Sequence, residues 1–214
     1  MPIDTPRVVA RRRAFTGWNT LDIVTVESSA ADGSPQRHDR EVIDHGNAAV
    51  VLPIDRARGV AVLVRQWRGP LVALGEPPYL LEACAGIVDP GETPEDTARR
   101  EAQEETGLNI GELTSRGSIL PSAGTLTERM HLFTAEISAS DRVQPGGGRP
   151  QEGEQIEVVE MPLAELFAMA ERGELQDAKT LAIVQRLRIE ELEAAQDSGG
   201  SDPGATTAPL RSWE

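Results

Sequence analysis

Residues 86–108 read GIVDPGETPEDTARREAQEETGL, and the rest of the chain is expected to be organised around this stretch. It predicts a short helix that follows a glycine-containing loop. Thr93 is a favourable N-cap, Pro94 suits the first helical position, and an acidic residue three positions after the cap completes a capping-box pattern. Gly107 provides a left-handed C-cap, so the helix is expected over residues 94–106.

The predicted helix has no large apolar stripe to bury, because its only apolar residues are one proline and two alanines. Glu101, Glu104 and Glu105 occupy positions i, i+3 and i+4, within an arc of about 100°. Like charges at this spacing cost roughly 0.2–0.5 kcal/mol per pair on an isolated helix. One interpretation is a solvated acidic face balanced by Arg99 and Arg100. The tight capping and the lack of apolar bulk favour another, a site for Mg²⁺ or Mn²⁺, which prefer oxygen ligands.

The spacing of the glycine, arginine and glutamate residues in this stretch matches a known motif. Gly86 is followed after five residues by Glu92, and after a further seven by the run REAQEETGL at 100–108. Every fixed position of the Nudix box is filled, and its aliphatic positions hold Ala102 and Leu108. The sequence therefore resembles the Nudix hydrolases. This resemblance implies an α/β fold, the Nudix α/β/α sandwich with a mixed sheet, here with an N-terminal β-hairpin extension.

The composition limits the size of the core and the possible partners. With 214 residues, the chain can bury one substantial core. A net charge of −14 argues against nucleic acid or an anionic membrane as a partner, because no basic field neutralises phosphates. Cys84 is the single cysteine; it lies in an apolar run, is expected to be a buried inert thiol, and fits a reducing cytoplasm. No apolar stretch approaches the length of a membrane span, so we expect a cytoplasmic protein.

Apolar and alternating runs predict the other elements. Strands are expected at residues 18–27, 37–44, 47–54, 59–67, 79–85, 113–120, 129–137 and 156–161, and helices at 163–172 and 178–195. A glycine- and proline-rich segment, 141–155, is expected to be an active-site loop. We therefore expect an N-terminal β extension over 1–46, a Nudix catalytic domain over 47–195 and a disordered tail over 196–214.

The Nudix resemblance implies roles for the charged residues around the helix. The implied metal ligands are the carbonyl of Ala85 and the carboxylates of Glu101, Glu105 and Glu154. The implied catalytic residues are Arg100, Glu104, Glu105 and Glu154. Glu104 is expected to be a shared or water-mediated ligand, Glu154 a base or an extra ligand, and Arg100 to orient a glutamate with Glu92 as its partner. His38, His45 and His131 lack zinc-ligand spacing and are expected to be structural or at the rim.

Segments outside the box resemble the GDP-mannose pyrophosphatase branch of this family over about residues 18–187. The segments that carry this similarity are residues 40–42, 46–47, 81–86, 127–128, 146–148 and 177–180. The implied substrate contacts are Trp18, Arg40, Arg68, Glu128 and Lys179. Trp18 would stack on the base, although it could equally be a core residue or a dimer contact. Ala123 stands where ADP-ribose hydrolases typically have proline, and Asp39 stands where the GDP-mannose branch has lysine.

The resemblance implies Mg²⁺-dependent hydrolysis, with Mn²⁺ also possible, of the pyrophosphate bond of a nucleoside diphosphate sugar of the GDP-mannose or ADP-ribose type. The products are a nucleoside monophosphate and a sugar phosphate. The alternatives are an ADP-ribose pyrophosphatase proper and a non-catalytic Nudix-fold regulator that binds nucleotides. In this branch the N-terminal hairpin exchanges between subunits, so we expect a homodimer with a composite site.

Overall fold

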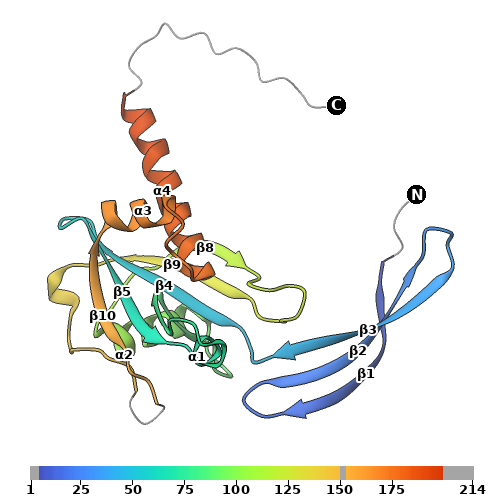
Figure 1. Ribbon diagram of the computed structural model, residues 1–214. Coiled ribbons are helices and arrows are strands. Elements are labelled where there is room, and N and C mark those ends of the chain that lie inside the picture. Colours follow the sequence, from blue (N-terminus) through green and yellow to red (C-terminus); the bar gives the residue numbers. More distant parts are fainter. Residues whose placement is uncertain (1–4, 150–152, 200–214) are drawn as a thin grey trace, which may run out of the picture.

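The computed structural model describes residues 5–149 and 153–199, which form a small N-terminal sheet and a larger layered body (Figure 1). In the small sheet, β1 (Arg7–Thr16), β2 (Thr20–Ser29) and β3 (Pro35–Asp44) pair antiparallel in that order. The sheet extends away from the body, and only the end of β3 leads into it (Figure 1). The predicted hairpin is present as β2 and β3, with Gly33 at a φ of 83° in the turn between them.

The strand β1 was missed by the sequence prediction, so the extension is a sheet rather than a simple hairpin. Every residue of β1 is exposed, and the strand contains four arginines, so it shows none of the apolar alternation that predicts a half-buried strand. Acidic side chains of β2 stabilise it instead. Arg7 donates to Glu27 from its Nε at 3.0 Å, and Arg13 pairs with Asp22.

The body is built on a mixed sheet in the order β10-β5-β4-β9-β8. Its strands are β4 (Ala48–Asp55), β5 (Val60–Trp67), β6 (Tyr79–Glu82), β7 (Cys84–Ile87), β8 (Thr114–Ile119), β9 (Met130–Glu136) and β10 (Glu157–Pro162). The parallel pair is β4 and β9. All residues of β4 are buried, as expected for a central strand covered on both faces.

The predicted strand 79–85 is in fact two strands that fill a fork between β4 and β5. The long strands β4 and β5 pair with each other only next to the turn that joins them, where Ile54 lies opposite Ala61. Beyond that point β6 pairs with β5 and β7 pairs with β4, and Ala83 separates the two short strands. One continuous strand could not pair with both diverging neighbours, which explains the break. We call this region, residues 79–87, the fork segment.

Helices cover both faces of the sheet, so the predicted α/β/α sandwich is confirmed (Figure 1). On one face α3 (Leu163–Glu171) and α4 (Ala178–Gly199) bury Leu166, Ile183 and Leu187 against the sheet. On the other face α2 (Pro94–Thr106) buries Ala98 and Ala102. Small residues allow the α2 backbone to approach the sheet closely, although the helix has little apolar bulk.

Two further boundaries differ from the prediction. A short helix, α1 (Gly69–Leu74), follows β5; with six residues and a proline near its start, it has too little periodicity to be recognised. Helix α4 continues to Gly199, so residues 196–199 are helical and the predicted start of a disordered tail at 196 is wrong. The remainder of that predicted tail lies outside the described residues. Within the described part of the chain, no helix is long and apolar enough to cross a membrane.

Candidate active site

The capped helix α2 has the bounds predicted from the sequence, and its two ends explain why. At the start, Thr93 accepts a hydrogen bond from the Asp96 N–H at 3.1 Å. At the end, Gly107 has a φ of 74°, and its N–H donates to the Gln103 carbonyl at 3.0 Å. The helix therefore has a fixed position relative to the fork segment, against which its acidic face packs.

The acidic face of α2 is turned inward, which excludes the interpretation of a solvated acidic helix. Glu105 is only 2% exposed, and its carboxylate accepts a hydrogen bond from the Ala85 N–H at 3.1 Å. Glu101 lies against Gly86, where an added Cβ would come within 1.8 Å of the Glu101 Oε1 atom. A side chain at position 86 would therefore displace the Glu101 carboxylate from its present position, although the backbone angles of Gly86 would allow one.

Burial makes two of these carboxylates hard to ionise. Desolvation, together with the nearby charges of Glu101 and Glu154, raises the pKa of Glu105 to about 8, although hydrogen bonds from Cys84 and the Ala85 N–H oppose this shift. Desolvation also raises the pKa of Glu101, although the Arg100 guanidinium opposes this shift. The neighbouring thiol of Cys84 is fully buried, and its pKa is raised well above the ordinary value by desolvation, so it is inert as predicted.

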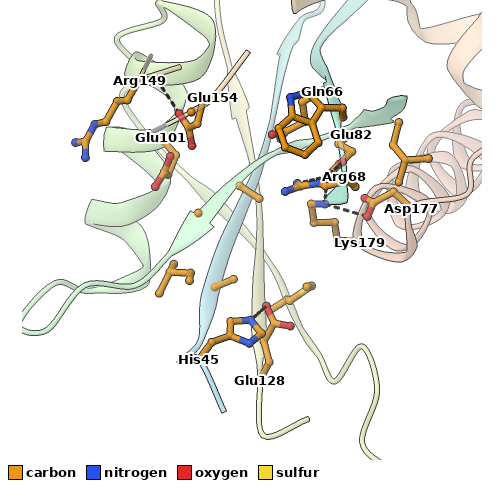
Figure 2. A pocket seen from close by; sticks show the side chains of 18 of the residues that line it. His45, Gln66, Arg68, Glu82, Glu101, Glu128, Arg149, Glu154, Asp177 and Lys179 are labelled. Carbon is orange, nitrogen blue, oxygen red and sulfur yellow. Dashed lines mark hydrogen bonds and ion pairs between the residues drawn. The ribbon is translucent and has the colours of Figure 1, made fainter. Parts of the chain in front are cut away.

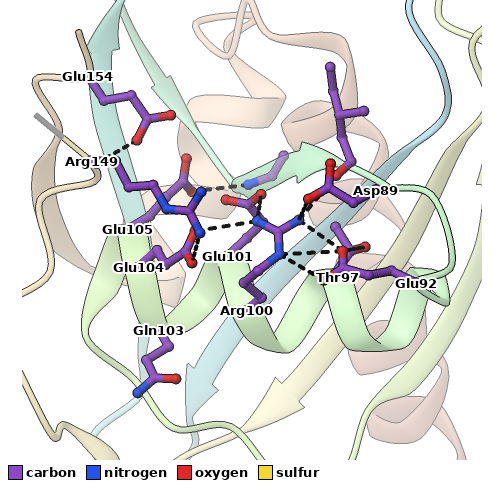
Figure 3. Close-up of polar contacts among 12 residues, drawn as sticks. Asp89, Glu92, Thr97, Arg100, Glu101, Gln103, Glu104, Glu105, Arg149 and Glu154 are labelled. Atoms are coloured by element: carbon purple, nitrogen blue, oxygen red, sulfur yellow. Dashed lines mark hydrogen bonds and ion pairs between the residues drawn. The ribbon is translucent and has the colours of Figure 1, made fainter. Parts of the chain in front are cut away.

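Arg100 connects the loop before α2 to the acidic face (Figure 3). Its Nη1 donates to Glu101 at 2.6 Å and to Glu104 at 3.3 Å. Its Nη2 donates to Glu92 at 3.0 Å and to the Ile87 carbonyl at 3.2 Å. The contact expected between Arg100 and Glu92 is thus present, and hydrogen bonds from this arginine lower the pKa of Glu92 to about 2.

The glycine-rich loop after β9 attaches to the C-terminal end of α2. The Gly147 N–H donates to the Glu105 carbonyl at 2.8 Å, and the Gly148 N–H donates to the Glu104 carbonyl at 3.1 Å. These contacts place Arg149 against Glu104, and the Arg149 N–H donates to the Glu154 carboxylate at 2.7 Å (Figure 3). The predicted loop glutamate is therefore held beside the acidic face of the helix.

A cavity of about 1160 Å³ opens in front of these residues. Figure 2 shows three polar groups around it: Glu101 with Glu154, the cluster Arg68, Glu82, Asp177 and Lys179, and the pair His45 and Glu128. Nε2 of His45 lies 3.6 Å from Oε1 of Glu128. The volume lies slightly above the usual range of about 300–1,000 Å³ for small-molecule sites, so the cavity can accept a ligand of nucleotide size.

The residues predicted as metal ligands fit a divalent cation by their chemistry. They are oxygen donors, and Glu101 and Glu105 are desolvated acids whose ionised forms a nearby cation would stabilise. Over residues 5–149 and 153–199, no three His, Cys, Asp or Glu side chains are arranged closely enough to hold a metal ion. Arg100 and Arg149 instead contact the carboxylates of Glu101 and Glu104.

Of the predicted substrate contacts, four line the cavity: Trp18, Arg68, Glu128 and Lys179. Trp18 is 83% exposed and lines the cavity of its own chain, so it is not a core residue. Arg40 does not line this cavity; it lies on β3 and its Nη1 donates to the Asp39 carbonyl at 3.0 Å. The reason is that β3 leaves the body at Asp44, which carries Arg40 into the protruding sheet.

The cavity also contains charged residues that were not predicted as site residues, among them Glu82, Asp177 and Arg149. His45, expected to be structural or at the rim, lines the cavity as well. For Glu82 a signal existed, because it is a charged residue inside an otherwise apolar predicted strand, where an unpaired carboxylate would be costly. His45, Arg149 and Asp177 lie in loops or next to the start of a helix. No regular spacing in the sequence predicts which residues of such segments reach a cavity.

Comparison with known proteins shows the family and the fold of this chain. A family model described as the NUDIX domain matches residues 44–182. The chain is 41% identical over 186 residues to GDP-mannose pyrophosphatase of Klebsiella pneumoniae, covering 86% of this chain and 90% of that protein. It is 39% identical to GDP-mannose pyrophosphatase of Pectobacterium atrosepticum, covering 88% of this chain and 95% of that protein.

A crystal structure of an ADP compounds hydrolase superposes with a TM-score of 0.70 over 91% of this chain and 98% of that chain. The sequence identity of this pair is 21%, so the likeness concerns the fold alone. The family model spans the acidic helix, the fork segment and the loop that carries Glu154, which all contribute to the cavity, whereas Trp18 lies outside the matched residues. This chain belongs to the Nudix family.

Proposed function

We propose that this protein hydrolyses the pyrophosphate bond of a nucleoside diphosphate sugar, with GDP-mannose as the favoured substrate. The observation that carries the proposal is one cavity in which acidic side chains, Glu101 and Glu154, face a cationic pair, Arg68 and Lys179. A diphosphate needs cations around its oxygens and a base for the attacking water. The similarity to GDP-mannose pyrophosphatases supports the choice of substrate.

In the proposed reaction a water oxygen forms a bond to one phosphorus, and the bridging oxygen leaves with the other phosphate. The proton of the water goes to a carboxylate, and a nucleoside monophosphate and a sugar phosphate are released. Among the predicted catalytic glutamates, Glu154 lines the cavity whereas Glu105 is buried behind it, so we assign the base to Glu154. Arg68 and Lys179 would hold the diphosphate while the bond breaks.

The proposal includes a divalent cation, Mg²⁺ or Mn²⁺, held by the Ala85 carbonyl, Glu101, Glu105 and Glu154. When bound, such a cation neutralises phosphate charge and makes water a better nucleophile. Arg100 would keep Glu101 and Glu104 oriented through its contacts with both carboxylates. Arg149, which contacts Glu104, would balance the acidic charge in the absence of a cation.

The proposed working form is a homodimer in the cytoplasm, with the N-terminal sheet packed on the second subunit. Val8, Phe15 and Trp18 are exposed on this sheet, and β1 is exposed along its whole length. A small sheet needs a packed face to be stable, and a second copy of the chain would supply one. The single cysteine is a free buried thiol, which agrees with a reducing compartment.

A substrate screen tests the activity. Purified protein is incubated with Mg²⁺ or Mn²⁺ and GDP-mannose, ADP-ribose, UDP-glucose or NADH, and release of the nucleoside monophosphate is measured. We expect metal-dependent turnover that is highest with GDP-mannose. Highest turnover with ADP-ribose would assign the chain to ADP-ribose hydrolysis instead. No turnover with any of them, together with retained nucleotide binding, would support the non-catalytic regulator and overturn the proposal.

A further inference from the structure

Glu82 is a buried carboxylate that binds both cations of the cavity wall. It is 1% exposed and lies at the end of β6 in the fork segment. Arg68 donates to it twice, from Nε at 2.7 Å and from Nη2 at 2.6 Å, and Lys179 donates to the same carboxylate through Nζ. Figure 2 shows this arrangement at one side of the cavity, away from Glu101 and Glu154.

Glu82 is ionised, and the formal charges of the cluster cancel. Burial alone would raise the pKa of Glu82, but the hydrogen bonds and charges of Arg68 and Lys179 lower it below the ordinary value. The hydrogen bond with Glu82 in turn raises the pKa of Arg68. Asp177 adds a second carboxylate, since it accepts from Nζ of Lys179 at 2.9 Å. Two cationic side chains therefore lie beside two carboxylates, and together these four residues give this side of the cavity little net charge.

Arg68 and Lys179 nevertheless have N–H donors that these carboxylates do not use. A guanidinium and an ammonium carry more N–H groups than these carboxylates take up, and both residues line the cavity. Within the described ranges, no other group accepts from the Nη1 atom of Arg68 or from a further N–H of Lys179. Two fixed cations with unused donors at one wall form a site for a doubly charged anion.

We propose that Glu82 is a positioning residue, which holds Arg68 and Lys179 so that their unused N–H groups bind the diphosphate of the substrate. Glu82 is only 1% exposed, and both of its carboxylate oxygens already accept hydrogen bonds from these two cations. Directed hydrogen bonds, rather than a net positive charge, would then give the wall its affinity for phosphate. The identity of the anion rests on the proposed function, whereas the orienting role of Glu82 rests on these contacts.

The neighbouring contacts fix Glu82 to the rest of the site. The Ala83 N–H donates to Thr180 Oγ1 at 2.7 Å, and the Thr180 N–H donates to Asp177 at 3.0 Å. These bonds tie the break between β6 and β7 to the start of α4, which carries Lys179. Two residues further along the same segment, Ala85 contacts Glu105. One short stretch thus sets the positions of the cationic wall and of the acidic face together.

A double-mutant cycle on ligand binding tests this role. GDP is the probe, and its dissociation constant is measured by calorimetry in buffer with Mg²⁺, where no turnover is needed. We expect Glu82→Gln and Arg68→Gln each to weaken GDP binding about 10-fold, because either change ends the fixed pairing. The double variant should also be weakened about 10-fold rather than about 100-fold, since both changes remove one shared interaction.

The matched control is Glu136→Gln, which removes the same charge from an exposed pair with Arg56 outside the cavity. It should leave GDP binding unchanged. In turnover assays Glu82→Gln should raise KM more than it lowers kcat, whereas a loss of folded protein would lower only the apparent kcat. Additive effects in the cycle, wild-type binding by Glu82→Gln, or no GDP binding by the unmodified chain would each overturn the proposal.

If Glu82→Gln does not fold, Arg68→Lys tests whether GDP binding depends on the orientation of Arg68 by Glu82. Arg68 is 41% exposed, so the change is tolerable, and lysine keeps the charge but cannot form the paired contact. We expect about 5-fold weaker GDP binding if orientation matters, and unchanged binding if charge alone matters, which would refute the role of Glu82. If no nucleotide sugar is hydrolysed but the cycle is non-additive, the proposed function fails while the role of Glu82 stands.

Discussion

At the scale of single residues, the site depends on carboxylates held where water cannot solvate them. Glu105 and Glu101 are both desolvated, whereas Glu92, on the loop before α2, is kept ionised by Arg100. The same residue type thus has opposite tendencies within one short segment, set by burial in one case and by a guanidinium in the other. This contrast distinguishes the proposed ligands from the residue that braces the loop.

Replacing Glu105 by glutamine should separate catalysis from stability. The amide has nearly the shape of the protonated acid, so the melting temperature should change little, and it cannot act as an anionic ligand. We expect kcat for the proposed hydrolysis to fall by about 10²-fold or more. Glu112→Gln, at an exposed glutamate next to α2, is the control and should retain full activity. Wild-type turnover by Glu105→Gln would contradict its assignment as a ligand.

Replacing Glu92 by glutamine should give a stability loss that depends on pH. The pKa of Glu92 is lowered to about 2 by Arg100, so its contribution is present above the unfolded value of 4.5 and is lost as the pH falls toward 2. Because the side chain is partly solvated, we expect the loss at pH 7 to be only about 1 kcal/mol.

Urea unfolding of both proteins between pH 7 and pH 3 measures this difference. It should shrink as the pH falls, because protonation of Glu92 in the unmodified chain removes the same charge. The exposed Glu95→Gln serves as the control, with a change below about 0.5 kcal/mol at any pH. A difference that is independent of pH would show that Glu92 is not stabilised by its charge.

At the scale of elements, the acidic helix and the fork segment must approach each other more closely than ordinary side chains allow. Gly86 permits this approach, because a methyl group there would overlap the present position of the Glu101 carboxylate. The fork exists because β4 and β5 separate, which admits β6 and β7 between them and brings Glu82, Ala85 and Gly86 to the cavity.

Gly86→Ala should therefore impair catalysis while the fold survives. The new Cβ would displace the carboxylate of Glu101, and misplacement by about 1 Å costs on the order of 100-fold in rate. The measurement is kcat together with the circular dichroism spectrum. Gly111→Ala is the matched control, since nothing lies within 4 Å of a Cβ at that position. Equal activity of the two variants would show that Glu101 can move without consequence.

At the scale of the whole molecule, the N-terminal sheet has few ties to its own body. The end of β3 is attached through the Ile43 N–H, which donates to the Thr125 carbonyl at 2.9 Å, and through Thr127, whose hydroxyl donates to Asp44 at 2.7 Å. The sheet nevertheless brings Trp18 to the cavity. A segment so weakly attached, yet part of the cavity wall, is consistent with a second subunit that holds it in place.

Phe15→Ser should weaken the proposed homodimer. Phe15 is 58% exposed on β1, and a polar residue there would remove apolar area from the interface. We expect the dimer dissociation constant, measured by light scattering over a dilution series, to rise at least about 10-fold. Val143→Ser is the control, because Val143 is equally exposed but lies on the body. A monomeric unmodified chain would contradict the dimer itself.

The amino-acid sequence was enough to predict the acidic helix with both of its ends, the sandwich fold and the family, because capping and motif spacing act over a few residues. It could not predict β1, because the arginines of this strand pair with acidic residues on the neighbouring strand β2. It also could not predict the break at Ala83, which arises because β6 pairs with β5 and β7 pairs with β4. The tertiary structure alone decided that Glu82 binds both Arg68 and Lys179, since these residues meet only through packing. Helix capping depends on residues that are close in the sequence. The pairing of charges that are distant in the sequence depends instead on how the sheet and the helices pack together.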